Sequence, residues 1–268
     1  MGCYVKNIIG NEDVVSDFKE LIPDAAIRRR MSRILRMAVT TAVTCCGDIA
    51  SMHSMDSIVT ATGYGCLADS ERFLRNMIQN NEEQLNPTPF IQSTFNTVGG
   101  LIALLSKNHA ENITYVNRSH SFEDALLDAY LQLADKEGKK ILLGTFDEIT
   151  ESSHLLLERL GLFRNGQRNG EGAIFMELTS DYSESCKIEI ERIEFSNTIL
   201  SKEECFARFA RSKEDHIFYN KFMEQGIYPT VSARLFYECT KNLQKGETMI
   251  LCNNYLGMGS SIILSKGV

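Results

Sequence analysis

Apolar residues along the chain follow two spacings, one typical of strands and the other of amphipathic helices. β-branched and aromatic runs predict strands at Tyr4 to Ile9, Ser57 to Thr62, Ile113 to Val116, Ile141 to Gly144, Ala173 to Leu178 and Ser185 to Phe195. Apolar residues at helical spacing predict helices at Ala25 to Cys46, Ser70 to Asn80, Ser93 to Leu105, Ser121 to Leu133, Ser152 to Arg159 and Ser201 to Arg211. The end of the chain, from Met249 to Lys266, predicts a strand, a glycine turn and a second strand. Strands and helices therefore alternate, which indicates an α/β fold.

The most informative passage runs from Asn86 to Thr150, and a strand-to-helix turn lies at its centre. The strand Ile113 to Val116 is joined to the helix Ser121 to Leu133 by four residues, Asn117 to His120. The free backbone N–H groups and the dipole at a helix N-terminus stabilise an anion. Enzymes often hold a nucleophile in such a turn, so we treat it as the candidate site.

Several segments resemble the β-ketoacyl synthases, the thiolase-fold condensing enzymes of fatty acid and polyketide synthesis. They are PFIQSTFN with VGGLIALL, then ITYVNRSHSFEDALLDA, ILLGTFDE and GEGAIFMEL. GEGA, from Gly170 to Ala173, is the most specific match because of its distance from the turn and its place at the start of a strand. The ending MILCNNYLGMGSSIILSK is similar to the family's glycine-rich ending, which makes Gly257, Met258 and Gly259 the candidates for its glycine turn.

The resemblance implies a thiolase-like α/β fold, in which two pseudo-repeated halves place stacked mixed sheets around buried helices. We expect a single body over residues 1–268, with an N-terminal half at 1–180 and a shortened C-terminal half at 181–268. With 268 residues and 43% hydrophobic content, the chain can bury such a core. Asp147 and Glu148, at the end of a strand, are expected to cap the helix that follows and to stand where the family has a glutamate.

The chain departs from the family at its reactive positions. The position of the cysteine nucleophile falls on Ser119, or on His120 with a slip of one, and no cysteine lies between Cys66 and Cys186. A thiolate is intrinsically nucleophilic and forms the acyl thioester used in condensation, whereas a serine needs an activating base. The position of the second His or Asn falls at Tyr228 or Pro229, and the Pro229 side chain cannot donate or accept a hydrogen bond. We therefore predict that no residue of this chain catalyses condensation.

The amino-acid composition restricts the classes of molecule that this chain is expected to bind. The net charge is −7 and the longest basic run is only Arg28 to Arg30, which argues against nucleic-acid binding. The arginines of the helix Ala25 to Cys46 form either a solvated face or a docking surface for an acidic carrier protein or its phosphopantetheine arm. Eight cysteines without CxxC or Cys/His ligand spacing favour reduced thiols, a cytoplasmic location, no metal site and no cofactor. No apolar stretch is long enough to predict a membrane span.

The resemblance implies a degenerate subunit of the chain-length-factor type, which pairs with an active synthase and works with acyl carrier protein. Compact relatives with the passage LNPTPFIQSTFNTVGG belong to pathways for aryl polyenes, flexirubin-like pigments or dialkylresorcinols. Candidates for the acyl pocket or the dimer interface are Asn117, Arg118, Ser121, Phe122 and Asn96. The apolar strand Ile113 to Val116 is expected at a sheet edge, covered by a partner's matching strand.

Two other functions fit the same sequence. The chain could be an acyltransferase or hydrolase that acts through Ser119 or His120, although no third group that would orient a base is identifiable. It could also be a non-catalytic homodimer that binds acyl groups or the carrier protein. An acyl adduct on Ser119 would favour the enzyme, and the oligomeric state would separate a homodimer from a heterodimer.

Overall fold

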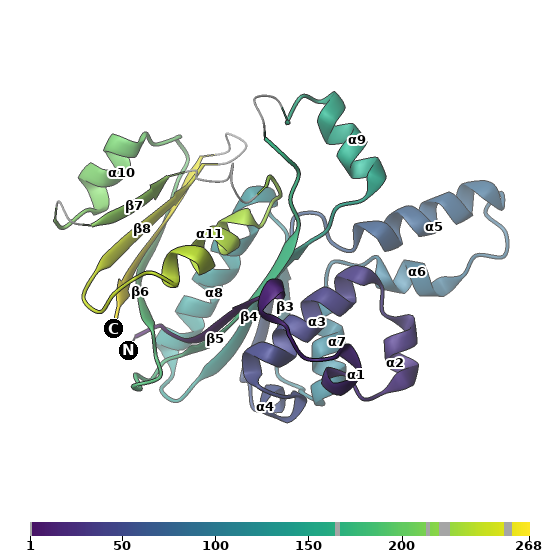
Figure 1. Cartoon of the computed structure of the whole chain (residues 1–268), viewed down its shortest axis with the longest axis horizontal. Coiled ribbons are helices and arrows are strands. Elements are labelled where there is room, and N and C mark those ends of the chain that lie inside the picture. The colour runs from purple at the N-terminus through teal and green to yellow at the C-terminus, as the bar shows by residue number, and fades with distance from the viewer. Residues whose placement is uncertain (1, 164–166, 213–214, 220–225, 255–258) are drawn as a thin grey trace.

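The computed structural model describes the chain except for residues 1, 164–166, 213–214, 220–225 and 255–258. Within the described residues, the strands form one nine-stranded sheet in the order β3-β2-β4-β5-β1-β6-β9-β8-β7 (Figure 1). The strands are β1 Tyr4–Gly10, β2 Ser57–Ala61, β3 Glu111–Tyr115, β4 Lys140–Asp147, β5 Gly172–Thr179, β6 Ile188–Ser196, β7 His216–Tyr219, β8 Thr248–Asn253 and β9 Ser260–Gly267.

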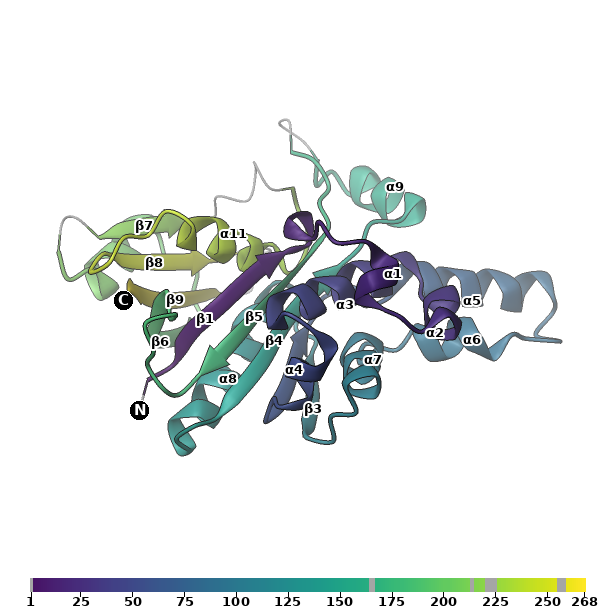
Figure 2. The same ribbon diagram turned by 60° about the horizontal axis from the view of Figure 1, so that its bottom comes forward.

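The sheet consists of two halves joined by a short pairing. In the first half, β2 pairs in parallel with β3 and β4, and β5 pairs antiparallel with β4 and β1. In the second half, β9 pairs antiparallel with β6 and β8, and β7 lies parallel to β8. Only Tyr4 and Val5 of β1 pair with β6, opposite Glu189 and Ile188. Figure 2 shows β1 running between β5 and β6, at the join of the two halves.

Two buried helices lie between the halves. Helix α8 (Ser121–Asp135) contacts β2, β3 and β4 of the first half and β6 of the second, and α11 (Val231–Thr240) contacts β1, β5 and β8. Their apolar residues belong to one core cluster with residues of both half-sheets. This is the layered arrangement of half-sheets around buried helices that the sequence predicts.

The remaining helices lie outside the buried layer, except η2 (Arg118–His120), which contains buried residues and precedes α8. They are η1 Asn11–Asp13, α1 Phe18–Leu21, α2 Ala25–Arg30, α3 Arg33–Cys46, α4 Ile49–His53, α5 Leu67–Gln79, α6 Pro87–Gln92, α7 Thr97–Ser106, η2 Arg118–His120, α9 Glu151–Arg159 and α10 Lys202–Phe209. A second core cluster holds residues of α3, α4 and α7 against the first half-sheet, and a third lies under α10 against the second half-sheet. Helices α5 and α6 project away from the body (Figures 1 and 2).

The predicted helix Ala25 to Cys46 is two helices, so that prediction is wrong in its continuity. Met31 and Ser32 have extended backbone, and the side chain of Met31 is buried in the second core cluster. The Arg28 guanidinium donates to the carbonyls of Ile22 and Pro23 instead of pointing into solvent. The chain turns here because a break lets Met31 enter the core.

Two helix starts also differ from the prediction. Helix α5 begins at Leu67, because the Glu148 carboxylate accepts the Ala68 N–H (2.9 Å) and satisfies a free donor of its first turn. Neither Asp147 nor Glu148 caps α9, whose N-cap is Thr150. The helix expected from Ser93 to Leu105 starts four residues later, at α7, because the preceding residues form α6 and a turn.

Candidate functional site

The turn between β3 and α8 is built as predicted. The Ser121 hydroxyl accepts the Asn117 N–H and donates to the Arg118 carbonyl, each at 2.8 Å, which closes the turn. Arg118 has a φ of +51°, a left-handed conformation that costs a non-glycine residue about 1–2 kcal/mol. The following residues, Ser119 and His120, are buried at the N-terminus of α8. Ser119 and His120, the residues that the resemblance aligns with the family's nucleophile, therefore lie at a helix start inside the protein.

A strand of the second half holds this turn from the inside. The Asn253 amide, at the end of β8, donates at 2.8 Å to both the Ser119 carbonyl and the Glu123 carboxylate. His120 Nδ1 lies 3.1 Å from the Ser261 hydroxyl on β9. Burial lowers the pKa of His120, so the imidazole is neutral at pH 7. The structure thus fixes the turn by contacts that cross from one half of the molecule to the other.

Glu123 is the buried carboxyl group beneath the turn. Its side chain is almost completely removed from solvent, and burial raises its pKa to about 7 despite the opposing hydrogen bond from Asn253. Among the described residues, its second oxygen has no hydrogen-bond partner. A carboxyl group in this setting is held close to the balance between its neutral and charged forms at neutral pH.

Pro229 and the turn that carries Ser119 lie close together in the structure. A Cβ on Gly63, in the loop after β2, would lie 2.1 Å from Pro229 Cβ and 3.3 Å from the Arg118 carbonyl oxygen. Glycine is therefore needed here for close packing. Pro229 and the turn that carries Ser119 face each other across Gly63.

Asp147 organises the same region and was not predicted as a site residue. Its Oδ1 accepts hydrogen bonds from the Thr62 hydroxyl and from the N–H groups of Gly63 and Tyr64. Its Oδ2 accepts from the N–H and the hydroxyl of Thr230, at the start of α11. Burial raises the pKa of Asp147, and these hydrogen bonds oppose that rise. A strand-terminal aspartate is a weak signal in a sequence, because its donors come from two loops distant along the chain.

The other predicted positions are distributed between core and surface. Phe122 is fully buried, with its ring 5.9 Å from that of Phe236, so it belongs to the core and is not on a surface that a partner can contact. Asn117 is exposed and donates to Asp124. Arg118 is also exposed, and Asn96 is the exposed N-cap residue of α7.

The predicted glycine turn is only partly visible. Gly257 and Met258 lie outside the described residues. Gly259 has a φ of +112°, and a Cβ there would lie 2.4 Å from the Ser196 carbonyl oxygen. Glycine is thus required at this position for the return into β9.

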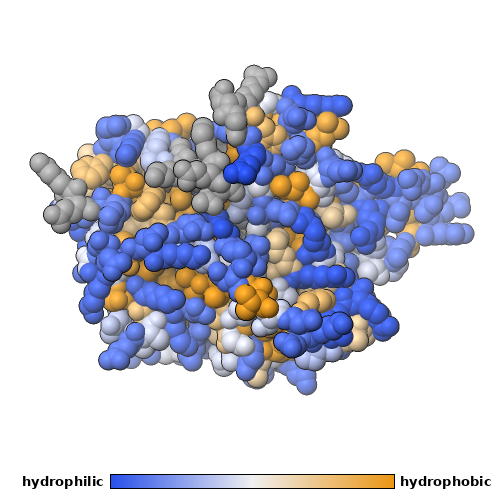
Figure 3. Space-filling model, in the orientation of Figure 1, coloured by the Kyte–Doolittle hydropathy of each residue, from blue (hydrophilic) through white to orange (hydrophobic). Residues whose placement is uncertain are grey.

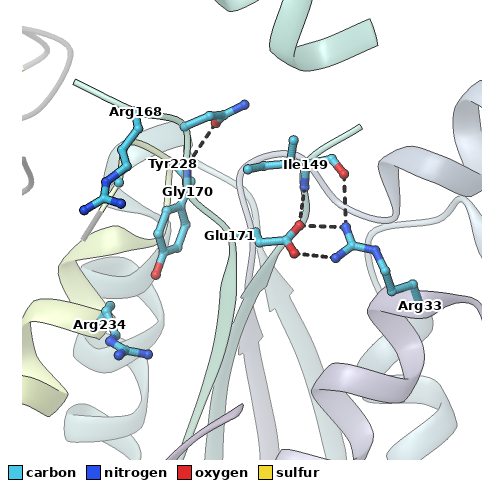
Figure 4. A pocket seen from close by; sticks show the side chains of 9 residues that line it. Arg33, Ile149, Arg168, Gly170, Glu171, Tyr228 and Arg234 are labelled. Carbon is cyan, nitrogen blue, oxygen red and sulfur yellow. Dashed lines mark hydrogen bonds and ion pairs between the residues drawn. The ribbon is translucent and has the colours of Figure 1, made fainter. Parts of the chain in front are cut away.

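A polar pocket of about 610 Å³ opens near the start of β5 (Figure 4). On one side Arg33 forms a clasp: it pairs with the Glu171 carboxylate and donates to the Ile149 carbonyl (3.0 Å). On the other side are Tyr228 and Arg234, and Arg234 pairs with acidic residues on η1 and α11. Arg33 therefore has a structural role in ion pairing, although its side chain is still about half exposed. Walls of this polarity do not suit an acyl chain.

Apolar side chains are exposed on α5, α6 and α7 and just after β3, and of these helices α7 packs against β3. They are Leu74 and Ile78 on α5, Phe90 and Ile91 on α6, Phe95, Leu104 on α7, and Val116 at the end of β3. We call this set the α5–α7 surface. A cleft of about 370 Å³ adjoins it, lined mainly by apolar residues of α2, α3, α6 and α7 and by Asn96. The face seen in Figure 3 has its hydrophobic residues scattered among hydrophilic ones.

The described residues contain neither a membrane-spanning helix nor a metal-binding cluster. No helix in the described ranges is long and apolar enough to cross a membrane. No group of three or more His, Cys, Asp or Glu side chains in that part of the chain could hold a metal ion.

Residues 11–160, more than half of the chain, match the family model of the β-ketoacyl synthase N-terminal domain. The fold is similar to that of the ishigamide ketosynthase/chain length factor, with a TM-score of 0.78, 12% identity and full coverage of both chains. It is also similar to a β-ketoacyl synthase from Burkholderia phymatum STM815, with a TM-score of 0.73 and 11% identity over 100% of this chain and 99% of that one. A ketosynthase (ApeO) in complex with its chain length factor (ApeC) from Xenorhabdus doucetiae gives a TM-score of 0.64 and 14% identity over 99% of each chain. No curated protein matches. At such identities the solved structures establish the fold, which is thiolase-like.

Proposed function

Because this chain belongs to the β-ketoacyl synthase N-terminal domain family, we propose that it is a non-condensing subunit of the chain-length-factor type that pairs with an active synthase. The observation that carries this proposal is the turn between β3 and α8. Its backbone closes around Ser121 and presents Ser119 and His120 at the helix start, where condensation requires a thiolate.

No described cysteine substitutes for the missing thiol. Cys252 is the closest candidate, because it precedes Asn253, which holds the turn. Successive side chains of a strand point to opposite faces, and Cys252 accordingly lies in the third core cluster under α10. The Pro229 position adds no donor for an oxyanion, so neither part of a condensing centre is supplied by these residues.

The edge of the sheet supports pairing with a partner. Within the described residues, β3 is the last strand of the sheet and pairs only with β2, so the N–H and C=O groups along its outer side remain available. The α5–α7 surface exposes seven large apolar side chains, and its helix α7 packs against β3. Contiguous exposed apolar residues are typical of protein interfaces. We propose that the partner is an active synthase and that its own edge strand continues the sheet at β3.

The ketosynthase from Xenorhabdus doucetiae is described in complex with its chain length factor, which is the arrangement proposed here for this chain. Another similar structure, at 10% identity, is a type II polyketide synthase acyl-carrier protein in complex with its ketosynthase. We propose that the pair extends chains carried by acyl carrier protein, in the cytoplasm, in a pathway of the aryl polyene type or for related pigments. Asn117 and Arg118, exposed on the turn near β3, are the residues we assign to the wall of the partner's acyl pocket.

Co-expression with active ketoacyl synthases from the same organism tests the proposal. We expect a 1:1 complex by size-exclusion chromatography and native mass spectrometry, and products of different length from those of the synthase alone. Ile91→Asp, which charges an apolar side chain of the α5–α7 surface that is 63% exposed, should weaken the complex at least about tenfold. Leu156→Asp is the matched control, because Leu156 is 60% exposed on α9. If the two chains elute separately and the products do not change, the proposal is wrong.

The alternative function for which the chain offers candidate residues is acyl transfer through Ser119 or His120. The structure gives His120 Nδ1 a neighbour in Ser261, so this nitrogen is not aimed at an incoming acyl group. Incubation with acyl thioesters followed by intact-protein mass spectrometry separates the two functions. A stoichiometric adduct that disappears in Ser119→Ala would establish the acyltransferase, and a homodimer without adduct would indicate the plain binding protein.

A further inference from the structure

Two buried cysteines meet under helix α10. Cys205 on α10 and Cys252 on β8 are 47 residues apart in sequence, and their sulfur atoms are 2.7 Å apart. Both side chains are completely buried, in the cluster that packs α10 on the outer face of the second half-sheet. Among the described residues, this is the one pair of cysteine sulfur atoms in contact, and both residues are free thiols in this structure.

We propose that Cys205 and Cys252 form a redox-active dithiol, which small disulfides such as oxidised glutathione convert into an intramolecular disulfide. Bond formation needs an S–S distance of about 2.05 Å, so the two sulfur atoms must approach by only a fraction of an ångström more. This inference rests on the positions of the two residues and does not depend on the proposed function.

The reaction proceeds by two thiol–disulfide exchanges. The Cys205 thiolate attacks one sulfur of the small disulfide, which breaks the small disulfide's S–S bond, releases one thiolate and leaves a mixed disulfide on Cys205. Cys252 then loses its proton and attacks the Cys205 sulfur, which releases the second thiolate. The two cysteines are oxidised to a disulfide. The two protons that they lose pass to the two released thiolates, so the small disulfide is reduced to two thiols.

The order of attack follows from the surroundings. The hydrogen bond from Cys252 lowers the pKa of Cys205, whereas the same contact and burial raise that of Cys252. Cys205 therefore forms the thiolate more readily and reacts first. Cys252 is deprotonated only when the mixed disulfide is already beside it.

Access to the pair depends on α10. This helix has eight residues and carries Cys205 and Phe209. Together with Leu200, it covers both sulfur atoms. Its start is fixed by an exposed capping box between Ser201 and Glu204. Local opening of a short surface helix requires much less free energy than global unfolding, so a small disulfide can enter by this route. Once formed, the bond ties α10 to β8, one residue before Asn253, which holds the turn at Ser119.

Oxidation of the full chain tests the proposal. The protein is incubated with oxidised glutathione, then denatured and alkylated, and its mass is measured. We expect two alkylated thiols fewer than the eight of the reduced chain, and a tryptic peptide that links Glu203–Arg208 to Gly246–Lys266. We also expect the oxidised protein to melt on the order of 10 °C higher, because the bond restricts the unfolded chain.

Cysteine variants, and oxidation during refolding, show whether the disulfide joins these two residues. Cys205→Ser and Cys252→Ser should each abolish the link, whereas Cys66→Ser, a buried cysteine at the start of α5, should retain it. The measurement is repeated after refolding from denaturant in oxidised and reduced glutathione. In the unfolded chain both cysteines are open to the small disulfide, so burial under α10 cannot prevent the reaction. The proposal is overturned if neither route yields the Cys205–Cys252 link, or if a different pair such as Cys45–Cys46 is linked instead.

Discussion

Asp147 connects three segments, because its two carboxylate oxygens accept five hydrogen bonds from the β2 loop and the start of α11. We expect Asp147→Ala to lower the free energy of unfolding by about 3–5 kcal/mol, since it leaves buried donors without an acceptor. Urea denaturation measures this change. Asp135→Ala, at an exposed aspartate at the end of α8, is the control and should change stability by less than about 0.5 kcal/mol. Equal effects of the two substitutions would show that the Asp147 network contributes little.

Glu123 makes stability depend on pH. Its pKa is about 7 in the folded chain and near the ordinary value of 4.5 when unfolded, so between these values the folded state holds a proton that the unfolded state releases. Stability contributed by this group is therefore present below about pH 4.5, falls as the pH rises and is lost above about pH 7.

Glu123→Gln keeps the shape of the side chain and cannot ionise. We expect this variant to be more stable than the natural chain by about 3 kcal/mol at pH 8, with the difference shrinking towards pH 5. Urea unfolding of both proteins at several pH values measures it. Parallel stability curves across this range would mean that the Glu123 carboxyl is not protonated in the folded chain.

At the scale of elements, close contact between two loops places a strict demand on Gly226. A Cβ there would lie 2.7 Å from Gly170 Cα and 3.0 Å from the Asn169 carbonyl oxygen, and the φ is +87°. Gly246 has nearly the same φ, +89°, but nothing lies within 4 Å of its Cβ position. We expect Gly246→Ala to cost about 1 kcal/mol for the left-handed backbone alone, and Gly226→Ala about 2 kcal/mol more for the clash. Thermal unfolding of the two variants compares these costs directly. Similar losses would show that the loop near Gly170 moves aside.

Elements with a local signal could be predicted, and elements fixed by distant contacts could not. The turn at Asn117 to His120 was predicted because a β-branched strand and an amphipathic helix flank it, and the capping box of α10 is visible as Ser201 and Glu204. The break at Met31 was missed because helical spacing continues across it, while the core that takes Met31 is formed by other segments. The edge strand β7 lies in a charged stretch and exists because β8 pairs with it.

Site positions could be assigned from the sequence only where a single residue departs from the family pattern. Pro229 lies beside the turn that carries Ser119, and the assignment of both residues to the family's reactive positions stays a prediction from the resemblance. The contacts of Asp147 and Asn253 could not be predicted, because their partners are between 83 and 134 residues away in sequence. Hydrogen-bond partners at such separations are set by the fold as a whole.

For the whole molecule, the shared core predicts one cooperative unit. Residues of α8, α11 and both half-sheets belong to a single cluster, so removing residues 181–268 would uncover the inner face of the first half. We expect a fragment of residues 1–180 to show no cooperative thermal transition and to bind a hydrophobic dye. The full chain should unfold in one transition with the same midpoint by circular dichroism and by tyrosine fluorescence, since it has nine tyrosines and no tryptophan. A fragment that melts cooperatively would show that the halves are independent domains.

The central position of β1 in the sheet has a consequence for synthesis on the ribosome. Tyr4 pairs with Thr179 and with Glu189, so the first strand cannot be placed until most of the chain has been made. At about 5–20 residues per second, this delay is on the order of 10–30 s. During that time Val5 and Ile8, which are buried in the finished protein, have neither neighbouring strand available. The nascent chain therefore presents an unpaired apolar strand until β5 and β6 have been made, and β1, although made before the rest of this sheet, is among its last strands to reach a native place.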